Sequence, residues 1–250
     1  MPSPPHYNPY VQHRRIPIRK SILSYTLILI LVNIIFFLII MFSLPFLGEE
    51  NFITFFRNYI ALTPAVFSSH PWTLLTSMFM HAPGYPFAIF SAHLLVNMLS
   101  LFFLGSFLEK IIGSKRLLGL YFIGGIAGSL LLLLLYSLSS DPRIIALSFF
   151  SSQSMKTAVD ISAVGASAAI FALAGCLAVL VPRLGVVVFF VIPMRLWMAI
   201  IFLIVIMSLV PGVANSAHLG GLLVGFFYAI YLRKKYKKKV AILNKIFTPR

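Results

Sequence analysis

Three apolar stretches of the chain carry polar side chains that together could hydrolyse an acyl bond. The stretch ISAVGASAAIFALAG contains Ser167, and ANSAHLGGLLVGFFY contains His218. The stretch SAHLLVNML contains His93 and Asn97, which are four residues apart and so share one face of a helix. A serine hydroxyl can attack a carbonyl when a histidine takes its proton, and further hydrogen-bond donors can stabilise the resulting oxyanion. These residue types therefore indicate nucleophilic acyl transfer.

Each of these residues also has a purely structural interpretation. In apolar helices, serine usually bonds back to a carbonyl one turn earlier or fills a seam of small residues. A His/Asn pair can join two helices by hydrogen bonds, and a single histidine can donate to a carbonyl. The combination of all four favours the catalytic interpretation, because polar side chains inside a membrane are costly and rare.

The acidic residues limit the possible mechanism. A serine–histidine pair often has a carboxylate that orients the imidazole. No acid lies in the stretches that hold Ser167 and His218; the five in the chain are Glu49, Glu50, Glu109, Asp141 and Asp160. The sequence therefore predicts a Ser–His dyad.

The composition places these residues in a lipid bilayer. Of the 250 residues, 60% are hydrophobic and 10% are charged, whereas about one-quarter are charged in soluble domains. Six stretches approach the length of about 20 mostly apolar residues that a spanning helix needs. We therefore predict an all-α polytopic membrane protein with six transmembrane helices, at residues 23–46, 91–112, 117–138, 163–181, 195–211 and 214–232.

The charge distribution predicts the topology and the domain organisation. If six helices cross the membrane, all but three of the 20 Lys and Arg residues lie in segments on one side. The positive-inside rule then puts both termini in the cytoplasm. We expect a basic N-terminal segment at residues 1–22, a membrane domain at 23–232, and a basic tail at 233–250. The tail would mainly anchor the topology and could also contact anionic lipid, and a nucleic-acid partner is not expected.

Two connecting segments differ from ordinary loops. Residues 47–90 are rich in aromatic side chains, which are typical of headgroup depth, so this first loop is predicted to lie partly in the membrane. Residues 183–194 are apolar but short, and we expect an interfacial or strand-like connector there.

Metal chemistry is not expected. Cys176 is the only cysteine, which excludes a cysteine-based metal cluster. The histidines His70, His81, His93 and His218 show no HExxH or other close ligand spacing.

At the four polar residues the chain resembles the rhomboid family of intramembrane serine proteases. The second predicted span has the HxxxN motif at residues 93–97, the fourth has GxSx at 165–168, and the sixth has AHxxGxxxG at 217–225. The resemblance covers about residues 70–232. Each motif alone is weakly specific, but three in the family's order are a strong signal.

The resemblance implies a role for each site residue. Ser167 would be the nucleophile, and His218 would be the general base and then the general acid. His93, Asn97 and the backbone N–H of Ser167 would form the oxyanion hole. Supporting positions would be Gly165 in the serine motif, Phe171 against the imidazole, and Gly221 on the helix-packing face.

The resemblance also implies the setting of the reaction. The substrates would be transmembrane proteins, cleaved without a cofactor or metal. The site would open to the extracellular side, with a mobile fifth helix or a cap admitting the substrate. The compact length, the six-span plan and the absence of an organelle-targeting pattern indicate a prokaryotic plasma membrane.

Two other functions remain open from the sequence. A catalytically inactive rhomboid-like protein would bind membrane clients without cleaving them. A transporter or channel would use His93, Asn97 and His218 as a polar pathway, but the internal inverted repeats typical of that class are not seen in the sequence.

Overall fold

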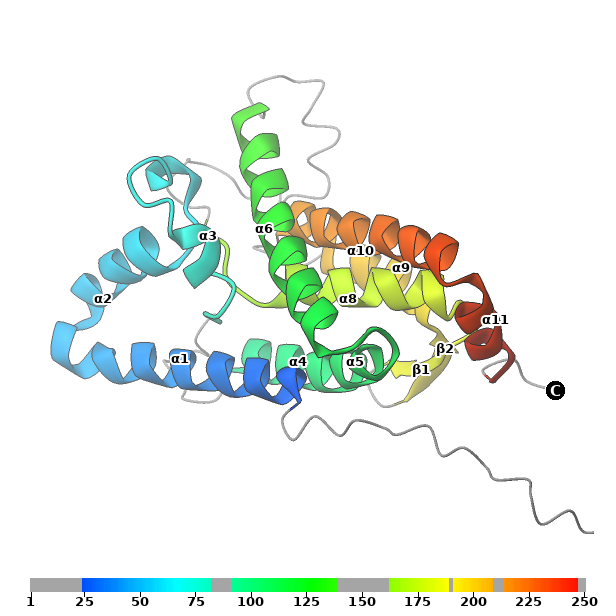
Figure 1. Cartoon of the computed structure of the whole chain (residues 1–250). Helices are drawn as coiled ribbons and strands as arrows, with labels where there is room; N and C mark the ends of the chain where they lie inside the picture. Colours follow the sequence, from blue (N-terminus) through cyan, green and yellow to red (C-terminus); the bar gives the residue numbers. More distant parts are fainter. Residues whose placement is uncertain (1–23, 82–90, 139–161, 189–190, 209–213, 247–250) are drawn as a thin grey trace, which may run out of the picture.

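The protein is mostly helical (Figure 1). The computed structural model describes residues 24–81, 91–138, 162–188, 191–208 and 214–246. The first half contains α1 (Tyr25–Leu47), α2 (Glu49–Phe55), η1 (Phe56–Ile60), η2 (Pro64–Val66), α3 (Thr73–Thr76), α4 (Ala92–Ser100), η3 (Leu101–Gly105), α5 (Ser106–Ile112) and α6 (Ser114–Leu138). The second half contains α8 (Ser167–Leu180), β1 (Gly185–Val188), β2 (Ile192–Arg195), α9 (Leu196–Ser208), α10 (Asn215–Lys235) and α11 (Lys237–Ile246).

Each of the six predicted spans contains a helix. Four helical stretches are long and apolar enough to cross a membrane: α1, the continuous helix Ala92–Ile112 formed by α4, η3 and α5, α6, and α10. Two further apolar helices are shorter, α8 and the stretch Leu196–Ile206 of α9. The structure therefore supports a multi-pass membrane protein, while the count of six spans stays a prediction.

The start of α8 differs from the prediction. We expected a helix from residue 163, but α8 begins at Ser167. The preceding residues are held in extended backbone, because Ala163 exchanges two hydrogen bonds of 3.0 Å with Leu62. Gly165 then adopts a φ of +126°, a backbone angle that residues with a Cβ atom rarely adopt. Long-range pairing thus overrides the helical pattern at this point.

Two short paired strands lie in the region of the predicted connector. β1 and β2 pair antiparallel, with Gly185 opposite Arg195 and Val188 opposite Ile192. The prediction of a strand-like connector at 183–194 is confirmed, so the described part of the chain is mostly helical rather than purely α-helical. Because β-branched valines are frequent in strands, this short Val-rich segment pairs rather than forming a helix.

The first loop is built from short helical elements. The described part of the predicted range 47–90 ends at residue 81 and contains α2, η1, η2 and α3. Gly48, with a φ of +73°, separates α1 from α2. Residues 82–90 lie outside the described part of the chain, and the depth of the loop in the membrane stays a prediction.

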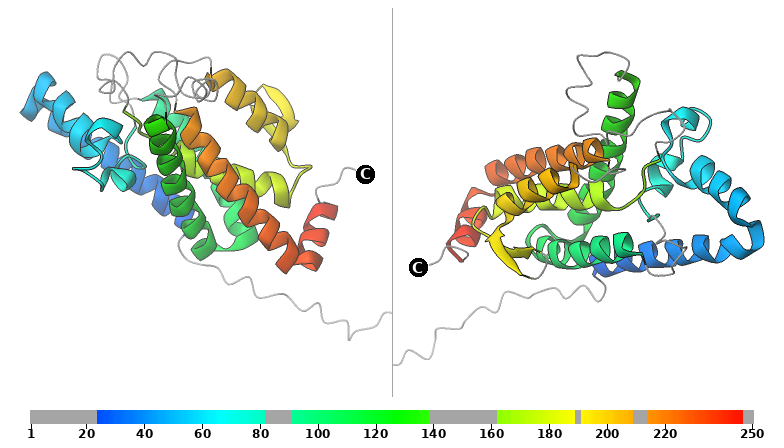
Figure 2. Two further views of the ribbon diagram at one scale, coloured as in Figure 1. Left: turned by 90° about the horizontal axis from the view of Figure 1, so that it is seen from above. Right: turned by 180° about the vertical axis from the view of Figure 1, so that it is seen from behind.

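α6, α8 and α10 form the centre of the molecule (Figures 1 and 2). α8 is apolar on every side and largely buried, as expected for a helix surrounded by others. Glycines allow its close contact with α10: an added Cβ at Gly221 would collide with the carbonyl oxygen of Ala168, and one at Gly225 with that of Ala172. Small residues at such spacing are typical of tightly packed membrane helices.

Glu109 on α5 joins the start of α1 to the core. Its carboxylate accepts hydrogen bonds from the hydroxyls of Ser24 (2.6 Å) and Thr26 (2.7 Å), and from the backbone N–H groups of Tyr25 (2.9 Å) and Thr26 (3.1 Å). The first N–H groups of a helix have no intrahelical acceptor, and a negative charge there is favourable. Glu109 therefore caps α1 from a neighbouring helix.

The predicted tail at 233–250 contains a further helix. α10 continues to Lys235, and α11 then folds back so that Asn244 Nδ2 donates to the carbonyl oxygen of Leu180 at 3.1 Å. The tail thus packs against the end of α8.

The glycine contacts lead to a stability prediction. Replacing Gly225 by Ala should lower the free energy of unfolding by about 1–3 kcal/mol, because the new methyl group meets a backbone oxygen that cannot move aside. Thermal unfolding in detergent measures the effect.

The matched control is Gly119→Ala on α6, where an added Cβ would meet no atom within 4 Å. This control should leave the unfolding midpoint unchanged or raise it slightly, since alanine favours helix. Equal midpoints for the two variants would contradict the role of Gly225.

Candidate active site

Ser167 and His218 are in direct contact. Ser167 is the first residue of α8, and His218 lies in the first turn of α10. The His218 Nε2 and Ser167 Oγ atoms are 2.8 Å apart, within hydrogen-bonding distance. His218 is buried, whereas Ser167 is partly exposed. This is the geometry a general base needs to take a proton from a nucleophilic hydroxyl.

Phe171 holds the imidazole from one side. The Phe171 ring stacks on His218 with centroids 4.6 Å apart and an interplanar angle of 17°. Because Phe171 is four residues after Ser167, the two side chains lie on the same face of α8. The predicted contact of Phe171 with the imidazole is present.

Gly165 brings His93 close to the serine. A Cβ built on Gly165 would lie 2.9 Å from both Cε1 and Nε2 of His93, and 3.7 Å from Ser167 Oγ. The backbone N–H of Gly165 donates to the carbonyl oxygen of Ser77 at 2.8 Å, which ties this turn to the first loop. The missing side chain at Gly165 is therefore what lets the His93 ring reach this position.

Asn97 is buried one turn after His93 on α4. Its Nδ2 donates to the carbonyl oxygen of His93 at 2.8 Å. This contact stays within α4, so the place of Asn97 in an oxyanion hole remains a prediction.

His81 is a further buried residue at the site, and the sequence indicated no role for it. Its ring lies edge-on to the His93 ring, with centroids 5.1 Å apart, and the Ala166 N–H points to its Nε2 at 3.5 Å. Burial, and then the neighbouring His93, lower the pKa of His81 to about 3, so its ring is neutral at pH 7. The contacts of His81 with His93 and with the turn before Ser167 could not be predicted from the sequence, because they join segments that are distant in the chain.

None of the described acids bonds to His218. Glu109 caps α1, and Glu49 and Glu50 are exposed at the start of α2. Asp141 and Asp160 fall outside the described residues. His218 Nδ1 is buried and has no hydrogen-bond partner within the described part of the chain.

His70 lies in an aromatic cluster of the first loop. Its ring packs edge-on against Tyr59 and Trp72.

Potential metal ligands do not cluster in the described segments. Among the residues from 24 to 246 that the structure describes, His, Cys, Asp and Glu form no group of three able to hold a metal ion.

Comparison with known proteins shows the family of this chain. The family model of the Rhomboid domain matches residues 68–235, which cover all four candidate site residues. The chain belongs to the rhomboid family. This region contains α4, α8 and α10, the three helices that supply His93, Ser167 and His218.

Individual rhomboid relatives come from bacteria and eukaryotes. The Rhomboid protease AarA of Providencia stuartii is 28% identical over 94% of this chain and 82% of its own length. RHOMBOID-like protein 1 of Arabidopsis thaliana is 31% identical over 77% of this chain and 43% of its own length. RHOMBOID-like protein 5 from the same plant is 32% identical over 66% and 46%. The chain thus spans less than half the length of these two plant relatives.

The close approach of His93 to Gly165 can be tested by substitution. Gly165→Ala should slow the reaction of Ser167 with a fluorophosphonate probe at least about tenfold, because the methyl group would displace the His93 ring. The unfavourable φ adds a stability cost on the order of 1–2 kcal/mol.

Gly113→Ala separates the two effects. Gly113 also has a positive φ of 86°, but an added Cβ there would meet no atom within 4 Å. This variant should lose similar stability and keep the labelling rate. A Gly165→Ala protein that labels as fast as Gly113→Ala would contradict the role of the close approach.

Proposed function

We propose that this rhomboid-family chain is an intramembrane serine protease that uses Ser167 and His218 as a catalytic dyad. The observation that carries the proposal is the 2.8 Å contact between Ser167 Oγ and His218 Nε2, with Phe171 stacked on the imidazole. A family member named as a protease, AarA, matches nearly the whole chain and supports the same activity.

The first half of the reaction forms an acyl-enzyme. Ser167 Oγ attacks the carbonyl carbon of the scissile peptide bond while its proton passes to His218 Nε2. The tetrahedral intermediate then collapses, the C–N bond breaks, and His218 gives the proton to the leaving amine. The stacked Phe171 keeps the imidazole in the plane that both transfers require.

The second half releases the product. A water molecule gives a proton to His218 Nε2 and attacks the acyl carbon. Collapse of this intermediate returns the proton to Ser167 Oγ and frees the new carboxyl group. Both halves use the same nitrogen, so one orientation of His218 is sufficient.

The start of α8 supplies one donor for the oxyanion. Ser167 is the first helical residue, and the first N–H groups of a helix make no intrahelical hydrogen bond. The positive end of the helix dipole also favours negative charge there. His93, which lies against Gly165 beside the serine, and Asn97 would supply the other donors.

The short length of α8 supports cleavage below the membrane surface. Its 14 residues rise about 21 Å at 1.5 Å per residue, less than the roughly 30 Å of the hydrocarbon core. Ser167 at the start of α8 would therefore lie below the bilayer surface. With both termini cytoplasmic, as the charge distribution predicts, the site would open toward the extracellular side of a plasma membrane.

The alternative function is binding of membrane clients without cleavage. The contact between Ser167 and His218 favours the protease, because a client-binding surface does not need a hydroxyl against an imidazole. The experiment below separates the two functions.

The nucleophile is tested by substitution in the purified full chain. Ser167→Ala should abolish fluorophosphonate labelling, and both Ser167→Ala and His218→Ala should slow cleavage of a transmembrane substrate at least about a thousandfold. The controls are Ser137→Ala, at the exposed end of α6, and His70→Ala, in the separate aromatic cluster. Labelling that persists in Ser167→Ala would refute the nucleophile; a wild type that neither labels nor cleaves would support client binding.

The substrate should need a weakened helix. A peptide bond inside a helix is shielded, so the substrate must unwind to reach Ser167, and Gly or Pro lowers that cost by about 1–3 kcal/mol per residue. Replacing such residues near the cut by Leu should slow cleavage at least about fivefold, measured by gel assay in liposomes. Unchanged rates across such a series would contradict entry by unwinding.

A further inference from the structure

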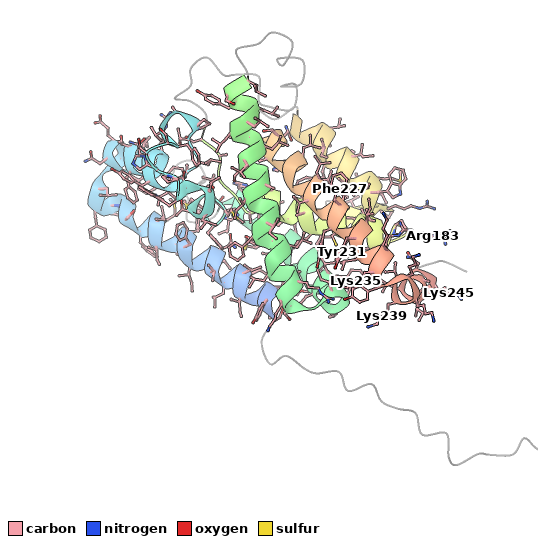
Figure 3. All side chains as sticks on the ribbon, turned by 45° about the horizontal axis from the view of Figure 1, so that its top comes forward. Arg183, Phe227, Tyr231, Lys235, Lys239 and Lys245 are labelled. Carbon is pink, nitrogen blue, oxygen red and sulfur yellow. The ribbon has the colours of Figure 1, made fainter. Side chains whose placement is uncertain are left out.

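A cavity lies where the ends of several helices meet, away from the candidate active site. Its volume is about 450 Å³, and its walls come from α5, the start of α6, the last residue of α8, the end of α10, and α11. Figure 3 shows Lys235, Lys239 and Lys245 near the end of α10 and on α11. The proposed protease chemistry makes no use of this cavity.

One part of the cavity wall is apolar. Ile111 of α5, Leu180 of α8 and Leu243 of α11 line it. Leu243 packs against the hydrophobic core around α8, and Asn244 beside it bonds to the carbonyl oxygen of Leu180. This wall suits a hydrocarbon chain, because apolar surface gains by leaving water.

The other part of the wall is positively charged. Lys110, Arg116 and Lys239 line it, and the lining includes no Asp or Glu. Tyr236 contacts two of these cations. Its hydroxyl accepts a hydrogen bond from Arg116 at 2.9 Å. Its ring centroid lies 5.3 Å from Arg116 Cζ and 5.9 Å from Lys239 Nζ. Such a set of Lys and Arg donors matches the oxygens of a phosphate.

The basic part of the wall lies at the ends of three candidate spans. The candidate span Ala92–Ile112 ends two residues after Lys110, Ser114–Leu138 begins two residues before Arg116, and Asn215–Lys235 ends one residue before Tyr236. Basic side chains at the ends of spans meet the phosphates of the bilayer.

We propose that this cavity binds one anionic phospholipid. The headgroup phosphate binds Lys110, Arg116 and Lys239, and one acyl chain lies along Ile111, Leu180 and Leu243. The bound lipid joins α11 to α5 and α6, so it stabilises the folded-back position of the tail helix.

The affinity for lipid tests the proposal directly. The full chain in detergent is titrated with phosphatidylglycerol or with phosphatidylcholine of the same acyl chains, and bound lipid is counted by native mass spectrometry. Phosphatidylglycerol should bind about tenfold more tightly or better and raise the unfolding temperature. Inorganic phosphate at the same concentration should give no shift, because it cannot fill the apolar wall.

Variants that remove equal charge distinguish a specific lipid site from general electrostatic attraction between the basic protein and anionic lipid. The triple variant Lys110→Gln, Arg116→Gln, Lys239→Gln should lose this preference for phosphatidylglycerol. The control triple Lys234→Gln, Lys237→Gln, Lys238→Gln removes the same charge from exposed positions that do not line the cavity, and should keep it. Lys239→Gln alone, at an exposed helix position, should weaken binding at least about threefold with the fold intact.

Three results would overturn the proposal. They are equal binding of the two lipids by wild type, equal loss of binding in the two triple variants, and a shift with inorganic phosphate as large as that with phosphatidylglycerol. Because the readouts are binding and unfolding, they do not depend on whether Ser167 is a nucleophile.

Discussion

The close contact between α8 and α10 is the constraint on which the candidate site depends. Ser167 and His218 are on different helices, and a 2.8 Å contact between their side chains requires the backbones to approach closely. Gly221 and Gly225 allow this, since their α-carbons face the carbonyl oxygens of Ala168 and Ala172. Any larger side chain there would separate the helices, because backbone atoms cannot rotate away as side chains do.

The first loop sets where α8 begins. Leu62 pairs with Ala163, Thr63 Oγ1 lies 2.9 Å from Ser162 Oγ, and Ser77 accepts the N–H of Gly165. These contacts keep residues 162–166 out of the helix, so that Ser167 is at its first position. The role of the first loop is therefore structural support of the serine, whatever its depth in the bilayer.

The surroundings of the His218 imidazole restrict its orientation without a carboxylate among the described residues. Stacking on Phe171 restricts the ring, and burial limits its motion further. Glu109, an acid within a candidate span, instead caps α1 through Ser24 and Thr26. This partly buried charge near the end of a candidate span is thus used to hold two helices together, and several donors offset the cost of burying it.

Residue types and spacing were sufficient to predict the six helical regions and the pairing of Ser167 with His218, because apolar length and rare polar residues are local properties of the chain. The start of α8, the position of His81 and the docking of α11 came only from the tertiary structure. The first of these depends on contacts such as Thr63 with Ser162, 99 residues apart, which no local pattern records. The apolar pattern of a helix can be read from neighbouring residues, whereas the start of α8 is decided by distant groups that bind the backbone before it.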